Sequence, residues 1–187
     1  ARPFVGARVV GSIGLSAEVI ESPLSAGELT ERWREILADS RLADFAGKVD
    51  LDCWGRITLS PVSTEHGGIA GNLVRLLMVQ LGGRALVEVG VRVASGVFAP
   101  DVAWCSEAFW QARRNETPLE RAPELCIEIS SPSNAIHDLR AKARAYIDAG
   151  AQETWIVFPK SQRIEVHDAS GVALHSAFKV DVSQAFT

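Results

Sequence analysis

Two carboxylates interrupt apolar segments near the middle of the chain. Glu128 lies within residues 125–129 (LCIEI), whose other side chains are apolar and predict a strand that is buried on both faces. Asp101 follows Pro100 in residues 97–104 (VFAPDVAW), which predict the preceding strand. Burying an unpaired carboxylate costs roughly several kcal/mol, so both positions require a cationic partner. Strands that follow one another in sequence are usually neighbours in a sheet, which would bring the two acids together.

Two kinds of cation could neutralise this pair. A divalent cation such as Mg²⁺ accepts one or two carboxylates together with water and phosphate oxygens, so it would remove the repulsion between the acids. Lys142, on the helix predicted to follow Glu128, shares a helical face with Leu139 and Tyr146, which directs its ammonium toward the sheet. A buried ion pair between Glu128 and Lys142 would be part of the scaffold and not a site of chemistry.

Helical spacing predicts three helices around these strands. Residues 25–40 begin with a capping box of Ser25 and Glu28, and their apolar stripe comprises Leu29, Trp33, Ile36 and Leu37. Residues 64–81 form a second helix that stops at Gly82-Gly83, and residues 131–150 form a third, which is entered through Ser-Pro-Ser and ends at a glycine. At the start of the second helix, Glu65 and its neighbour His66 occupy positions from which either side chain could point toward the interior of the fold. Negative charge at a helix N-terminus is the simpler explanation of Glu65.

Alternation with period two predicts the strands. In residues 49–59, Val49 and Leu51 alternate with Asp50, and Gly55 turns the chain, which indicates a hairpin. Residues 85–93 place four valines on one face of a single strand, residues 111–121 read as a charged loop, and short strands close the chain at 153–158, 163–168 and 172–178. This order of elements predicts a mixed α/β (α+β) fold in which helices flank a mixed central sheet.

Composition sets broad limits. The chain has 187 residues and 47% hydrophobic content, which predicts a single folded domain over residues 1–187, with residues 1–24 as a weakly patterned N-terminal extension. Its net charge of −4 gives no general basic surface. A nucleic-acid contact would need a local patch, for which Trp110 and five arginines are candidates: Arg113, Arg114, Arg121, Arg140 and Arg144.

The cysteines and the hydropathy suggest where the protein resides. Cys53, Cys105 and Cys126 lie in apolar strand-like segments without paired spacing, which favours free thiols in a reducing compartment, and we expect the cytoplasm. The sequence contains no stretch of about 18 apolar residues, so it predicts no membrane span.

Three segments together resemble the Uma-two family of restriction-endonuclease-like proteins, in the PD-(D/E)XK nuclease superfamily. They are residues 59–77 (LSPVSTEHGGIAGNLVRLL), 99–104 (APDVAW) and 122–157 (APELCIEISSPSNAIHDLRAKARAYIDAGAQETWIV). The resemblance extends over roughly residues 25–185. It implies a restriction-endonuclease-like core and an endonuclease that uses Mg²⁺, with Mn²⁺ as a substitute, to hydrolyse phosphodiester bonds in DNA. Asp101 and Glu128 would then be metal ligands, together with the carbonyl of Ile129.

The resemblance also implies roles for residues on the helices. The superfamily's usual Glu-x-Lys motif would have a lysine where this chain has Ser130, and Lys142 is the residue that would replace it, orienting water or stabilising the transition state. Tyr146 would hydrogen-bond the lysine or a substrate oxygen, or would simply pack the helix. The role of a helix-borne acid falls to Glu65, with His66 as the alternative.

Two other functions fit the same residues. A nuclease fold without turnover could bind nucleic acid or a protein partner, which the acidic balance and the displaced lysine favour. A structural or dimerising domain with an internal Lys-Glu pair is the third possibility. For an active enzyme, a homodimer is the simplest arrangement that cuts both strands of a duplex.

Overall fold

The protein is described by a computed structural model that covers residues 22–42, 45, 47–132 and 134–187. Its main sheet has six strands, of which one neighbouring pair is parallel and the other pairs are antiparallel, so the predicted mixed sheet is confirmed. Most of the predicted N-terminal extension, residues 1–21, lies outside the described residues. The strands of this sheet lie in the order β10 (Gly171–Ala173), β9 (Arg163–Asp168), β8 (Glu153–Phe158), β7 (Leu125–Ile129), β6 (Val102–Cys105) and β3 (Arg84–Val87).

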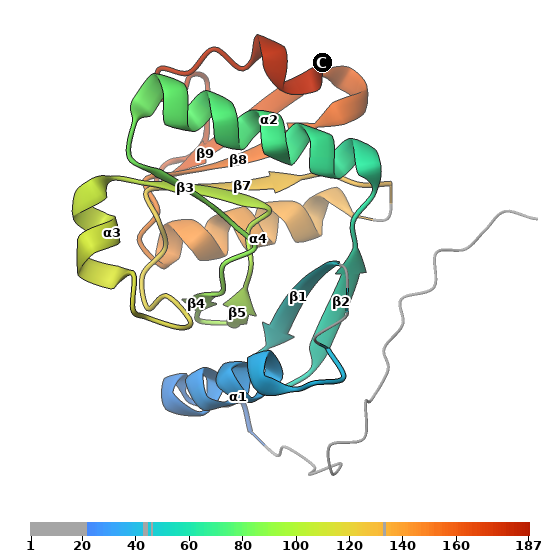
Figure 1. Ribbon diagram of the computed structural model, residues 1–187, viewed down its shortest axis with the longest axis vertical. Coiled ribbons are helices and arrows are strands. Elements are labelled where there is room, and N and C mark those ends of the chain that lie inside the picture. The colour runs from blue at the N-terminus through green and yellow to red at the C-terminus, as the bar shows by residue number, and fades with distance from the viewer. Residues whose placement is uncertain (1–21, 43–44, 46, 133) are drawn as a thin grey trace, which may run out of the picture.

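A second sheet of four strands lies beside the main sheet (Figure 1). Its first two strands form the predicted hairpin, in which Leu51 pairs with Ile57. The strand that pairs with this hairpin, β5 (Gly96–Phe98), continues through residues 99–101 into β6 of the main sheet, so the two sheets meet at Asp101. The strands of the second sheet lie in the order β2 (Ile57–Pro61), β1 (Gly47–Asp52), β5 (Gly96–Phe98) and β4 (Val91–Val93).

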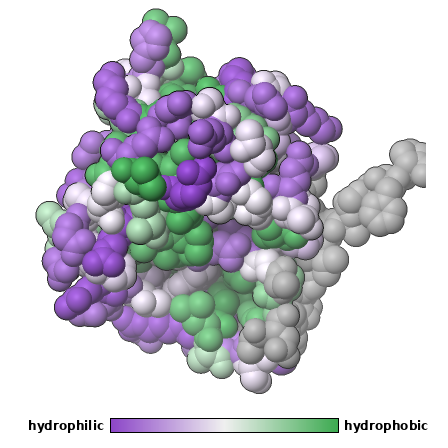
Figure 2. Space-filling view, turned by 45° about the horizontal axis from the view of Figure 1, so that its top comes forward, coloured by the Kyte–Doolittle hydropathy of each residue, from purple (hydrophilic) through white to green (hydrophobic). Residues whose placement is uncertain are grey.

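Helices cover both faces of the main sheet, as predicted (Figure 1). Helix α2 (Thr64–Leu81) has the predicted bounds and packs its apolar stripe on one face, whereas α4 (Ile136–Asp148) packs on the other. Alternation along β7 therefore directs Leu125, Ile127 and Ile129 to α2, and Cys126 and Glu128 to α4. On the face drawn in Figure 2, hydrophilic side chains surround a hollow in which hydrophobic side chains gather.

Helix α1 (Ala26–Ala38) covers the second sheet. It begins with the predicted capping box, since Ser25 and Glu28 exchange hydrogen bonds between side chain and backbone. Leu29, Trp33 and Ile36 are buried against β1 and β5. The prediction for Leu37 is wrong, because Leu37 is 60% exposed. The stripe that α1 buries consists of the three residues just named, and Leu37 lies beside it.

The predicted strand over residues 85–93 is wrong, because the chain turns sharply inside it. Glu88 has a left-handed backbone with φ of 52°, and it separates β3 from β4. At Gly90 a Cβ atom would lie only 2.5 Å from the Trp33 ring, so the tight approach of α1 also requires glycine there. Val87 is consequently 57% exposed, whereas Val91 is buried.

Other boundaries also differ from the predictions, including the start of α4, which lies at Ile136 and not at residue 131. The segment 97–104 is two strands separated at residues 99–101, where the N–H of Ala99 bonds a side chain instead of a strand and Pro100 has no N–H to donate. The charged segment 111–121 is partly helical, because Ser106 caps a short helix, α3 (Glu107–Arg113). Of the predicted last strand, only its first residues belong to β10.

All three cysteines are free thiols, as predicted, although Cys53 is only half-buried. Within the part of the chain that the structure describes, we find no helix with the length and apolar character needed to cross a bilayer.

Candidate active site

The pairing of β6 with β7 brings the two carboxylates together. Val102 and Ile127 are partners in this antiparallel pair, so the residue before Val102 and the residue after Ile127 face each other. Asp101 lies in the bend immediately before β6, and its Oδ2 accepts a hydrogen bond of 2.6 Å from the backbone N–H of Ile129. Asp101 and Glu128 are 5% and 1% exposed, which means that almost no solvent is left to stabilise their charges.

The cation that both carboxylates share is Lys48. Its Nζ lies 2.6 Å from Asp101 Oδ1 and 2.7 Å from Glu128 Oε2. Lys48 comes from β1 and is itself only 7% exposed. The two carboxylates are thus close enough to share one cation. The ammonium nearest to Glu128 is that of Lys48, and the predicted partner Lys142 pairs with Glu128 at the longer distance of 4.0 Å.

Lys142, on α4, approaches Asp50 and the Glu128 oxygen that Lys48 does not contact. Its Nζ lies 2.5 Å from Asp50 Oδ2 and 4.0 Å from Glu128 Oε1, and its side chain is 22% exposed. Asp50 also accepts a hydrogen bond of 2.9 Å from the N–H of Ala99. The hydroxyl of Tyr146 donates to Glu128 Oε1 over 2.8 Å. Burial, and then the charge of Glu128, raise the pKa of Tyr146 well above its usual value, so the hydroxyl keeps the proton that it donates.

We call this group the charged cluster; its members are Lys48, Asp50, Asp101, Glu128 and Lys142. At the start of α2, His66 lies beside it, with Nε2 3.4 Å from Asp101 Oδ2, and the His66 side chain is 17% exposed. Glu65 is exposed in the first turn of the helix, and none of the contacts described for the residues of the cluster includes it. Of the two alternatives for a helix-borne residue, the fold therefore brings His66 to the cluster.

Burial and charge act differently on the groups of the cluster. Burial raises the pKa of Asp101, but Lys48 and His66 lower it more strongly, to about 2. Burial keeps the pKa of Glu128 above its usual value of 4.5, against the attraction of Lys142 and Lys48. Burial also lowers the pKa of Lys48, yet Glu128 and Asp101 more than offset it and hold that pKa well above its usual range. Lys48 and Asp101 are therefore a fully charged pair at neutral pH, and the charge of Glu128 depends on the cations around it.

The pair of carboxylates fits a magnesium-type site in its donor chemistry. Both carboxylates converge on one cation, and Mg²⁺ is usually held by one or two carboxylates, with water and substrate phosphate completing its shell. Across the described ranges, no three or more Asp, Glu, His or Cys side chains come together as a metal-binding group. A divalent cation here would therefore take two side-chain ligands from the described residues, and backbone carbonyls, water or substrate would supply the rest.

Another buried carboxylate, Glu165 on β9, lies outside the charged cluster and has a different environment. Arg140 on α4 donates two hydrogen bonds to it, of 2.8 and 2.9 Å, and His167 Nε2 lies 2.9 Å away. Glu165 is 6% exposed, and its two oxygens are occupied by these partners. This arrangement links α4 to β9 and is structural.

Replacing Glu165 by glutamine is expected to flatten the acid side of the stability profile. Hydrogen bonds from Arg140 lower the pKa of Glu165 from 4.5 to about 2, although burial opposes them. A depressed pKa stabilises the fold above 4.5, and that stabilisation is lost as the pH falls toward 2. Thermal melts over this range should show a steeper loss for the wild type than for Glu165→Gln. Equal slopes would contradict the assignment.

The predicted basic patch is largely paired with acids. Arg140 binds Glu165, Arg113 lies 2.9 Å from Glu116, and Arg144 lies 2.7 Å from Asp148. These pairs reduce the positive potential that a phosphate backbone would meet.

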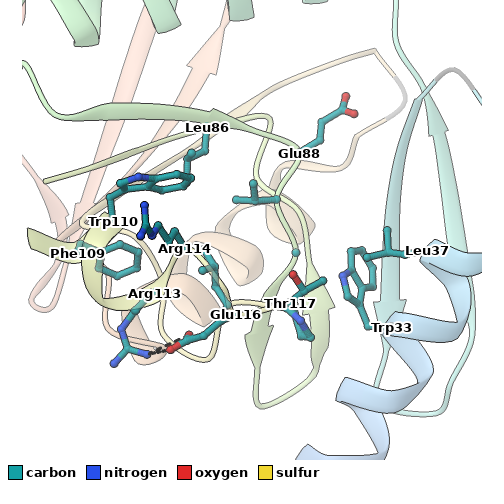
Figure 3. Close-up of a pocket in the computed structure, with 14 residues that line it drawn as sticks. Trp33, Leu37, Leu86, Glu88, Phe109, Trp110, Arg113, Arg114, Glu116 and Thr117 are labelled. Atoms are coloured by element: carbon teal, nitrogen blue, oxygen red, sulfur yellow. Dashed lines mark hydrogen bonds and ion pairs between the residues drawn. The ribbon is translucent and has the colours of Figure 1, made fainter. Parts of the chain in front are cut away.

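Trp110, the aromatic candidate for a nucleic-acid contact, lines a pocket of about 320 Å³ (Figure 3). The pocket lies between α1, α3 and the β3–β4 turn, and Trp33 and Glu88 belong to its wall. The guanidinium of Arg84 lies 5.6 Å from the centre of the Trp110 ring. None of the residues of the charged cluster lines this pocket, so it is a separate feature of the surface.

Lys48 and Asp50 are the members of the cluster that the sequence did not predict. Alternation placed Asp50 on the outer face of a hairpin, opposite Val49 and Leu51, where a carboxylate is ordinarily solvated. In the structure that face of β1 lies against the junction of the two sheets, and both residues are 7% exposed. The only available signal was that a lysine and an aspartate share one face of a strand, which is common on exposed hairpins.

Comparisons with known proteins agree with this architecture. Residues 41–180 match the model of the Uma2 family, described as "Putative restriction endonuclease". A crystal structure of "a putative nuclease belonging to DUF820" from Anabaena variabilis is similar to the chain with a TM-score of 0.58 and 18% sequence identity. The similarity covers 71% of this chain and 86% of that one, and at this identity it shows the fold alone. A comparison with curated proteins gave no match.

Proposed function

The chain belongs to the Uma2 family of restriction-endonuclease-like proteins, and from this premise we propose that it is a metal-dependent nuclease that hydrolyses phosphodiester bonds in DNA. One observation carries the proposal: Asp101, immediately before β6, and Glu128, on the neighbouring β7, converge on a single cation. Structural proteins have little reason to keep two carboxylates buried side by side, because an apolar pair of similar volume is often as stable or more stable.

Asp101 and Glu128 would hold Mg²⁺, for which Mn²⁺ can substitute, with the carbonyl of Ile129 as a third oxygen ligand. When bound, the cation supplies a water molecule of lowered pKa and neutralises charge on the phosphate. The hydrogen bond from the N–H of Ile129 fixes one oxygen of Asp101, and the hydroxyl of Tyr146 fixes one oxygen of Glu128. These contacts hold both carboxylates in position before a ligand arrives.

Lys142 and His66 are the members of this region with the most solvent contact. Lys142 would stabilise negative charge on the phosphate or orient the attacking water, since its side chain is 22% exposed and its ammonium lies 4.0 Å from Glu128. His66, beside Asp101, would accept or donate a proton at the edge of the cluster. Glu65, which is exposed on the first turn of α2, would act only if substrate reached that turn.

A second function has its own supporting observation. The carboxylates of the cluster are almost completely buried and already paired with two lysines. A protein that binds nucleic acid or a protein partner without turnover would need no more than this internal arrangement. The two functions differ in whether a divalent cation changes what the protein does.

The test is cleavage of supercoiled plasmid DNA by the purified protein with millimolar Mg²⁺ or Mn²⁺, and with EDTA as the control. The proposal predicts nicked and then linear DNA with either metal, and intact plasmid with EDTA. Single-stranded DNA and RNA substrates in parallel would identify the preferred nucleic acid. Retention of DNA in a gel shift without cleavage under any of these conditions would favour the inactive binding module instead.

A further inference from the structure

Lys48 occupies the point that the two candidate metal ligands share. Its ammonium contacts one oxygen of Asp101 and one of Glu128 at 2.6 and 2.7 Å, which are distances of strong charge-assisted hydrogen bonds. The remaining oxygens of both carboxylates are occupied, by the Ile129 N–H and by the Tyr146 hydroxyl. The oxygens that face each other are thus the ones that bind the lysine.

The charges of the cluster leave little room for an additional cation. With all groups ionised, three carboxylates face two ammonium groups, and the cluster carries one net negative charge. A divalent cation added to this group would leave an excess of positive charge in a buried region. With the Lys48 ammonium removed, the net charge is minus two, which a divalent cation neutralises in full. His66, at the edge of the cluster, can add only positive charge.

We propose that Lys48 is a built-in competitor of the divalent cation: its ammonium takes the cation position between Asp101 and Glu128, and a metal ion binds there only when Lys48 withdraws. The inference rests on the proposed function, because it takes these two carboxylates as the metal ligands. Lys48 lies on β1, in the second sheet, whereas the carboxylates belong to the main sheet. Its flexible stem allows the ammonium to leave while β1 keeps its pairing with β2.

The two lysines offer a matched pair of variants. Lys48→Met removes the ammonium that lies between the carboxylates, and Lys142→Met removes an ammonium of the same charge whose nearest partner is Asp50. A general electrostatic effect would raise metal affinity similarly in both. Competition for one position predicts a much larger effect for Lys48→Met.

The experiment is calorimetric titration of the wild type, Lys48→Met and Lys142→Met with Mn²⁺ at neutral pH. Lys48→Met should bind at least about tenfold more tightly than the wild type, since a unit charge a few ångström from the metal costs more than one decade of affinity even in a medium of high effective dielectric. Mn²⁺ should also raise the Tm of Lys48→Met more than that of the wild type. Lys48→Gln, which keeps a hydrogen-bond donor, replaces Lys48→Met if the latter does not fold.

The outcomes separate this inference from the proposed function. Equal affinity in the wild type and Lys48→Met, or equal gains in both lysine variants, would overturn the competition while leaving the metal site intact. No binding by any folded variant would instead overturn the metal site itself.

Discussion

Asp101→Asn is expected to lower the rate of metal-dependent DNA cleavage by at least about 100-fold. Metal ions contribute several kcal/mol to stabilising charge in such transition states, and each 1.4 kcal/mol or so is a factor of ten in rate. The variant removes the negative charge of a candidate ligand but keeps a side-chain oxygen that can accept the Ile129 N–H. The fold should therefore persist. The measurement is the rate of plasmid nicking at saturating Mg²⁺, together with a thermal melt.

Asp52→Asn is the matched control for this prediction. Asp52 lies on β1, near the cluster in sequence, but its carboxylate binds Arg56 at the turn of the hairpin and is 36% exposed. Losing a surface ion pair of this kind has little effect, so the cleavage rate should remain that of the wild type. Wild-type cleavage by Asp101→Asn would remove this residue from the proposed active site.

Trp33→Ala is expected to lower the free energy of unfolding by about 3–5 kcal/mol, the usual cost of truncating a buried aromatic side chain to alanine. Trp33 is 3% exposed and packs α1 against the second sheet and the turn at Gly90. That sheet carries Lys48 and Asp50, so loosening α1 should also disturb the charged cluster. Denaturant unfolding monitored by circular dichroism measures the change.

Trp54→Ala is the control for the stability prediction, because Trp54 is 39% exposed at the turn of the β1–β2 hairpin. It should cost well under half as much as Trp33→Ala. Equal losses in the two variants would mean that α1 is not an integral part of the core.

Local patterns in the sequence predicted the elements that carry the candidate metal ligands. The apolar stripe and the glycine stop gave α2 its bounds, and the uninterrupted apolar residues around Glu128 predicted a strand covered on both faces. Their place within apolar segments singled out Asp101 and Glu128, the family resemblance implied that they are metal ligands, and the pairing of β6 with β7 places them opposite each other. These features follow from short-range periodicity and from neighbouring strands, which a sequence displays directly.

The partner of those carboxylates was not predictable in the same way. Lys48 lies 53 residues before Asp101 and 80 residues before Glu128, and it reaches them because a second sheet docks against the first. Nothing in the alternation of β1 distinguishes a face that meets another sheet from a face that meets water. Lys142 was the nearer lysine by sequence, yet docking of β1 supplied it with Asp50 as its closest partner.

The central claim is that Asp101 and Glu128 together form a divalent-cation site. Its most direct test is calorimetric titration with Mn²⁺, which binds such oxygen sites more tightly than Mg²⁺ does, at millimolar concentrations and low salt. The account predicts binding by the wild type that disappears in both Asp101→Asn and Glu128→Gln while the variants remain folded. Absence of binding by the folded wild type and by folded Lys48→Met, or unchanged binding in either carboxylate variant, would contradict it.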